Sequence, residues 1–225
     1  DFLGRDALSR ILNGGRSLFL LSVLATLVAY VIGLPAGLVA GYKGGRLDTV
    51  IMRCVDFLLA FPPLLFLLLI STGTQASIIA LVLSAGFILA PSLARIVRAA
   101  VLDVAHRSYV EAAITRGERT GRILRREIMP NILGPVLADA GLRLTYAILL
   151  IAGMNFLGLG LQPPQSDWAL MITENKVGIT LQPWVVLVPC LLIAGITVAI
   201  NLISDSLARS LGTSVEALNS QAATR

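Results

Sequence analysis

The side chains best placed to do chemistry gather in one polar, strongly basic stretch, residues 108–131 (SYVEAAITRGERTGRILRREIMPN). Carboxylates and guanidinium groups at this density suit ionic and hydrogen-bonded contacts with a partner in the water. Apolar runs long enough to cross a bilayer flank the stretch on both sides. A membrane protein with one such loop is expected to present it to something outside the bilayer.

The spacing inside this stretch predicts two short amphipathic helices. Val110, Ala113 and Ile114 recur at i, i+3 and i+4, which places them on one helix face. Gly117 would end this helix and Thr120 would cap the next. A compact knob and a basic helix lying on anionic lipid both fit this pattern. The second helix would carry Ile123, Leu124 and Ile128 on its apolar side, Arg122, Arg125 and Arg126 on its basic side, and Pro130 at its end.

A second group of polar side chains falls inside apolar runs, where isolated charges are costly. Asp139 and Arg143 are four residues apart, so they face the same side of one helix and can neutralise each other. Two interpretations stay open: a self-paired couple at a protein interface, or the lining of a path for a charged solute. Asn155 and Asn201 are weaker candidates for the same path.

The sequence lacks the residues that several other kinds of chemistry require. The phosphate-loop spacing GxxxxGK[ST] does not occur in the sequence, so no nucleotide site is expected in this chain. The single histidine, His106, cannot build a metal cluster. Cys54 and Cys190 lie in separate apolar segments without CxxC spacing, and each is expected to be a buried small hydrophobe.

Composition places the chain in the membrane class. Of its 225 residues, 56% are hydrophobic and 14% are charged, whereas soluble domains average about 25% charged residues. The net charge of +5 sits between apolar runs, which indicates membrane topology rather than nucleic-acid binding. The predicted fold is all-α, a polytopic membrane helix bundle with five spans at about 18–40, 50–72, 76–94, 130–157 and 177–204.

Two of these spans carry further signals. Gly33, Gly37 and Gly41 recur every fourth residue, which predicts close approach of a second helix. In the second span, Arg53 and Asp56 are three residues apart and are predicted to pair on one helix face.

Charge asymmetry predicts the orientation. The loops at 41–53 and 95–126 fall, with the C-terminal tail, on one side and hold most of the 18 Lys and Arg residues, so this side is predicted to be cytoplasmic. The external connection 158–183 would be either a re-entrant or surface-lying segment or an ordinary interfacial loop. The expected domains are an external segment (1–17), a transmembrane domain (18–209) with a cytoplasmic loop at 106–130, here called the basic loop, and a cytoplasmic tail (210–225).

Three groups of residues in the basic loop and just after it resemble the EAA loop of permease subunits in bacterial ABC importers. They are Glu111-Ala112-Ala113, Gly117 and Ile128-Met129-Pro130-Asn131. Further motifs recur in order along essentially the whole chain and resemble the dipeptide/oligopeptide/nickel permease family, specifically its C-type subunit. These motifs are Gly4-Arg5-Asp6, Gly41-Tyr42-x-Gly44-Gly45, Asp48…Arg53…Asp56 followed by Ala60-Phe61-Pro62, Tyr109-Val110, Phe156-Leu157-Gly158-Leu159-Gly160 and Gln162-Pro163-Pro164.

The resemblance implies a type I ABC importer permease fold in the bacterial inner membrane. The family is expected to have six helices, the first preceding Gly4 and therefore expected to be missing here. Implied partners are a second homologous permease, two ATP-binding subunits, an extracytoplasmic substrate-binding protein and the lipid bilayer. ATP and Mg would bind to the partner ATPases, so this chain would be no enzyme and would hold no cofactor.

The resemblance also implies roles for the loop residues. Glu111 would contact the ATPase, Ala112 and Ala113 would allow close packing, Gly117 would permit the turn, and Pro130 would couple the knob to the next helix. Peptides or a related small solute would cross by alternating access, with Asp139 and Arg143 suited to peptide termini if they line the path. The implied coupling residues are Tyr109, Glu111, Ala112, Ala113, Gly117, Ile128 and Pro130.

Two other functions compete with an importer permease. A stand-alone secondary transporter or channel for a small solute would have no evident need of a projecting knob, and the chain shows no proton-relay series of carboxylates. A structural membrane scaffold fits poorly with the polar residues in and beside the spans. Co-isolation with ATPase subunits would separate the three.

Overall fold

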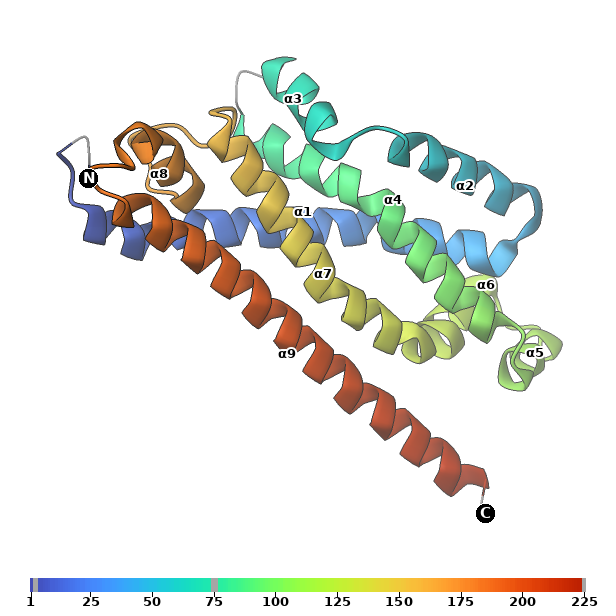
Figure 1. Cartoon of the computed structure of the whole chain (residues 1–225). Coiled ribbons are helices and arrows are strands. Elements are labelled where there is room, and N and C mark those ends of the chain that lie inside the picture. The colour runs from blue at the N-terminus through green and yellow to red at the C-terminus, as the bar shows by residue number, and fades with distance from the viewer. Residues whose placement is uncertain (2–3, 74–76, 224–225) are drawn as a thin grey trace.

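The structure, a computed structural model, describes residue 1, residues 4–73 and residues 77–223, with side chains described through residue 207. Every regular element in these ranges is helical, as the sequence predicts. Four helices are long and apolar enough to cross a membrane, and a bent pair of shorter helices brings the number up to five. Figure 1 shows the N-terminus and α8 at one end of the bundle and α5 and α6 at the other.

The closest helix contact joins α1 (Ala7–Lys43) to α4 (Ile78–Ala105). The glycine face of α1 makes this contact. A Cβ atom built at Gly33, Gly37 or Gly41 would lie within 2.8 Å of an atom of α4. Real Cβ atoms do not approach so closely, so these glycines permit the two backbones to approach as predicted.

The second predicted span is two helices rather than one. α2 (Gly45–Leu59) and α3 (Pro63–Gly73) meet at an angle of 81°. Pro62 and Pro63 explain the break, because each lacks a backbone N–H and the ring of each clashes with the preceding helical turn. The prediction of one continuous span over 50–72 was therefore wrong in its geometry.

Two other spans differ in their bounds. The third was expected to end near residue 94, yet α4 continues to Ala105, because Arg95 and Arg98 find acidic partners on α2. The fifth was expected from about residue 177, but α9 (Trp184–Ala223) begins after a short 3₁₀ turn, η2 (Lys176–Gly178). The remaining long helix is α7 (Met129–Phe156).

Short helices occupy both ends of the bundle. α5 (Ser108–Thr115), α6 (Thr120–Ile123) and the π-turn η1 (Leu124–Ile128) form the basic loop, and α8 (Trp168–Asn175) lies in the connection before α9. One buried apolar cluster joins α1, α3, α4 and α7, and a second joins α4 and α7 to the loop helices. Cys54 and Cys190 are exposed on the surface of the chain, so the expectation that both are buried was wrong.

Candidate functional site

The apolar face of α5 anchors the basic loop in the bundle. Val110 and Ala113 are fully buried and pack with Ile123, Ile128 and Val101 in one cluster. Val110 and Ala113 of the predicted apolar face therefore hold the loop against the bundle, whereas Ile114 is exposed and its predicted place on the buried face was wrong. Because α4 and α7 supply the rest of this cluster, a force on the loop helices acts directly on two long helices.

The turn after α5 depends on Gly117. Its φ of +75° lies in the left-handed region, which glycine adopts without strain. The N–H groups of Gly117 and Glu118 donate to the carbonyls of Ile114 and Ala113 at 2.9 and 3.2 Å, closing the helix end. The predicted capping role of Thr120 was wrong. Arg119 occupies the N-cap position without a side-chain hydrogen bond, and Thr120 is the first helical residue.

The sequence suggested that Pro130 ends the second loop helix, and this prediction was wrong. The chain is helical from Thr120 to Phe156 and widens to a π-turn at Leu124–Ile128. Pro130 offers a physical reason, because it has no N–H to donate to Arg126 and its ring would clash with that carbonyl in a regular α-helix. The loop and α7 are thus one continuous element.

The residues implied to couple to an ATPase divide into two sets. Glu111 and Ala112 are exposed, and Tyr109 is 36% exposed. Ala113 and Ile128 are completely buried in this chain's own core. The outward face offers Glu111 and Ala112 to a partner, whereas Ala113 and Ile128 hold that face in place.

A basic surface lies on the second part of the loop, in α6 and η1. Gly121, Arg122, Arg125 and Arg126 surround an open hollow of about 570 Å³. Three guanidinium groups around one hollow suit an anionic surface. Among the described residues, no group of three or more His, Cys, Asp or Glu side chains could hold a metal ion.

Asp139 and Arg143 form the predicted pair inside the bundle. Their side chains are each 5% exposed, and Arg143 Nη2 lies 2.7 Å from Asp139 Oδ1. Arg143 also donates to the carbonyl of Leu89 at 3.2 Å and to the hydroxyl of Ser92. The pair is therefore neutralised locally and ties α7 to α4.

The two asparagines also make internal contacts. The buried Asn155 accepts a hydrogen bond from the N–H of Leu161 at 2.9 Å and so shapes the turn after α7. Asn201 Nδ2 donates to Thr145 Oγ1 at 3.0 Å and joins α9 to α7. The contacts of both asparagines are therefore with other parts of this chain.

Sequence reasoning missed the ion pairs between α2 and α4. Asp56 pairs with Arg95 at 2.7 Å, not with Arg53 as predicted. Asp48 accepts hydrogen bonds from Nε and Nη2 of Arg98 at 2.5 and 2.6 Å. Arg53 makes no ion pair within the described part of the chain. The partners lie about 40 to 50 residues apart, so spacing within one helix could not reveal them.

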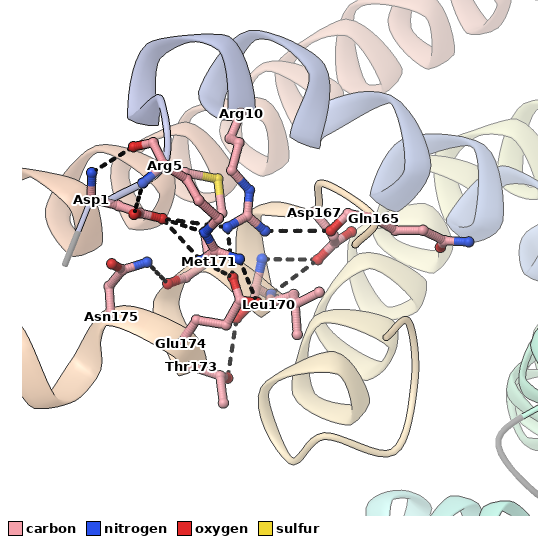
Figure 2. Close-up of polar contacts among 11 residues, drawn as sticks. Asp1, Arg5, Arg10, Gln165, Asp167, Leu170, Met171, Thr173, Glu174 and Asn175 are labelled. Atoms are coloured by element: carbon pink, nitrogen blue, oxygen red, sulfur yellow. Dashed lines mark hydrogen bonds and ion pairs between the residues drawn. The ribbon is translucent and has the colours of Figure 1, made fainter. Parts of the chain in front are cut away.

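A second missed cluster joins the N-terminal segment to α8 (Figure 2). Glu174 accepts hydrogen bonds from both terminal nitrogens of Arg5 at 3.0 and 2.7 Å, and Arg10 Nη1 lies 2.8 Å from the same carboxylate. Trp168 adds a hydrogen bond from Nε1 to the carbonyl of Ile11 at 2.8 Å. Two arginines on the predicted external side are thereby neutralised, and α8 is a docked helix rather than an irregular loop.

Two carboxylates of α8 have pKa values shifted in opposite directions. Burial raises the pKa of Asp167, although the N–H groups of Leu170 and Ala169 and the hydroxyl of Ser17 oppose the shift. Burial also acts on Glu174, but hydrogen bonds and charge from the paired arginines outweigh it and lower the pKa. Glu174 is therefore ionised when it docks α8, whereas Asp167 caps the helix at some electrostatic cost.

The fold and the site together define a multi-pass membrane helix bundle with one structured basic loop. The family described as binding-protein-dependent transport system inner membrane component matches residues 33–216, and the chain belongs to it. The predicted resemblance is confirmed: this is a permease component of an ABC importer in the inner membrane.

Individual relatives are named for peptide transport. The chain is 36% identical to the di/tripeptide transport system permease protein DppC of Pseudomonas aeruginosa over 94% of this chain and 70% of that protein. It is 34% identical to the glutathione transport system permease protein GsiD of Pectobacterium atrosepticum over the same shares. Solved structures of the inward-facing MetNI methionine ABC transporter share the fold. One has a TM-score of 0.76 at 18% identity, over 90% of this chain and 96% of that one.

Proposed function

We propose that this permease moves peptides across the inner membrane by alternating access, driven by ATP hydrolysis on partner subunits. The relatives named for dipeptide, oligopeptide and glutathione transport support the peptide substrate. The observation that carries the coupling proposal is the basic loop, whose exposed face presents Glu111 while its apolar face is buried among α4 and α7.

The proposed complex has two permeases, two ATPases and an external binding protein. Each ATPase receives one basic loop, with Glu111 making polar contact and Ala112 allowing close approach. ATP and Mg bind to the ATPases. The basic loop and the C-terminus are cytoplasmic, and α8 lies at the opposite end, where the binding protein delivers substrate.

Force passes from the loop to the spans through a stiff connection. The π-turn leads without interruption into α7, and Pro130 stands at the start of that helix. The Asp139–Arg143 pair then couples α7 to α4 through Leu89 and Ser92. This contact supports a mechanical role for the pair, and a role for these two residues in lining the path stays a prediction.

The test is ATP hydrolysis by the whole complex reconstituted in lipid, with Glu111→Ala, Gly117→Asp and the control Asp103→Ala. Asp103 is an exposed carboxylate on α4, close to the loop but outside it. We expect Glu111→Ala to weaken substrate-stimulated hydrolysis or ATPase retention. Gly117→Asp should act more strongly, because it also strains a backbone at φ +75°. The control should behave as wild type.

Normal, coupled hydrolysis in both loop variants would overturn the assigned roles of Glu111 and Gly117. Failure of any ATPase to co-purify with the wild-type permease would overturn ATP-driven import and favour a stand-alone transporter or channel.

A further inference from the structure

α2 and α4 border a charged hollow that opens to the surface of the chain. Its volume is about 330 Å³, within the range of about 300–1,000 Å³ that is typical of small-molecule sites. We refer to it as the α2–α4 hollow. Its lining includes Met52 and five charged residues: Asp48, Arg53, Asp56, Arg95 and Arg98.

The Asp56–Arg95 pair joins two helices that belong to candidate membrane spans. Asp56 follows Gly45, the first residue of α2, by about 16 Å along the helix axis. Arg95 precedes Ala105, the last residue of α4, by about 15 Å. Arg95 lies about 26 Å from Ile78, the first residue of α4, so the pair is in the half of α4 that is nearer the basic loop.

The Asp56–Arg95 pair is exposed on the surface of the chain. The side chains of Arg95 and Asp56 are 55% and 54% exposed although they bind each other at 2.7 Å. Charged groups within membrane spans usually face water-filled cavities or other protein, because contact with hydrocarbon is costly. Arg53 is also exposed and makes no ion pair among the described residues. This face of the chain must meet water or protein in the assembled transporter.

Phe57, which follows Asp56 in the sequence, begins a group of aromatic rings that runs past the bend between α2 and α3 to α4. Phe57, Phe61, Phe66 and Phe87 form a chain of ring contacts with centroids 5.2, 6.0 and 6.3 Å apart. Charged groups of both signs beside an aromatic surface fit a solute that has two opposite charges and an apolar side chain.

We propose that the α2–α4 hollow is a binding site for zwitterionic peptides in the translocation path, an inference that rests on the proposed function. Asp56 binds the α-ammonium group, and Arg53 and Arg95 bind the α-carboxylate through charge-assisted hydrogen bonds. Opening the Asp56–Arg95 pair costs little, because exposed ion pairs contribute little to stability. The less exposed Asp48–Arg98 pair positions the two helices.

The first experiment measures access to the hollow in the complete transporter. Met52→Cys is placed in a Cys54→Ser, Cys190→Ser background, and its reaction with a charged methanethiosulfonate reagent is followed in proteoliposomes with and without dialanine. We expect reaction in the absence of peptide and at least a severalfold slower reaction with saturating dialanine. Lack of reaction, or reaction that dialanine does not slow, would overturn the site.

The second experiment separates peptide binding from a purely structural ion pair. Uptake of dialanine is measured for Asp56→Asn, Arg95→Gln, the exchanged pair Asp56→Arg with Arg95→Asp, and the control Asp103→Asn. The exchanged pair retains the attraction between the helices but inverts the charges offered to a peptide. We expect all variants to assemble, and uptake to fall about tenfold or more in the first three.

Recovery of uptake by the exchanged pair would show that the charges only hold helices together or contact the second permease, and would overturn the proposal. Assembly and ATP hydrolysis are measured in the same preparations. If the site alone is wrong, the complex still hydrolyses ATP and imports peptide normally with Asp56→Asn. If the importer function is wrong, no ATPase accompanies even the wild-type chain.

Discussion

The Asp139–Arg143 and Asp56–Arg95 pairs join the same two chemical groups at the same distance of 2.7 Å, but in opposite surroundings. In the first pair both side chains are 5% exposed, and Arg143 also donates a hydrogen bond to α4. In the second pair both side chains are more than half exposed, and the pair bridges two helices. A buried pair is fixed in place by its desolvated surroundings, whereas an exposed pair can exchange partners at little cost.

The largest expected effect comes from breaking the buried pair. Asp139→Ala leaves the Arg143 guanidinium uncompensated between α7 and α4, and loss of one partner of a buried pair costs about 3–5 kcal/mol. We expect a markedly lower unfolding temperature for the detergent-solubilised complex, or failure to assemble.

The matched control removes both charges. Asp139→Leu with Arg143→Leu should regain much of the lost stability, because apolar residues often replace a buried pair at little cost. Restored assembly and import in this double variant would identify the pair as structural. Restored assembly without import would instead favour the alternative in which it lines the path.

A smaller effect is expected at the N-terminal cluster, which is intermediate in burial. Glu174 is 11% exposed and Arg10 is 10% exposed. Glu174→Gln should destabilise the docking of α8 by about 1–3 kcal/mol, since the amide keeps only one acceptor oxygen and loses the charge that neutralises Arg5 and Arg10. Faster hydrogen exchange of the α8 amides in the assembled complex would measure this change.

The pKa shifts of α8 predict the pH dependence of this docking. The folded-state pKa of Glu174 is lowered, so its contribution is complete above the unfolded value near 4.5 and is lost as the pH falls through the folded value. The folded-state pKa of Asp167 is raised, so protonation of Asp167 favours the docked state. Asp167→Asn should therefore leave docking at pH 7 unchanged or stronger, the opposite of Glu174→Gln.

The smallest stability effect is expected at the exposed pair. Asp56→Asn should change the unfolding temperature little, because exposed pairs contribute about 1 kcal/mol or less. Its effect on dialanine uptake should nevertheless be large. A loss of stability as great as that of Asp139→Ala would remove the distinction between the two pairs.

Much of the fold could be predicted because its signals are local. Apolar runs located the spans, and the four-residue spacing of Gly33, Gly37 and Gly41 predicted the close helix contact. The bend at Pro62-Pro63 and the π-turn before Pro130 were missed, although the residues responsible are visible in the sequence. Proline marks where a helix is disturbed, but packing decides whether the chain bends, widens or stops.

The sequence by itself determined that this is a polytopic membrane protein with one basic loop, and its motifs identified the permease family. Hydrophobic runs and residue spacing depend only on neighbours along the chain, so they are present before folding. The tertiary structure alone decided which partners the charges find: Arg95 meets Asp56, Arg98 meets Asp48, and Arg5 meets Glu174. It also turned Ala113 inward while leaving Glu111 outside. Such pairings join residues far apart in sequence, and only the packing of whole helices brings them together.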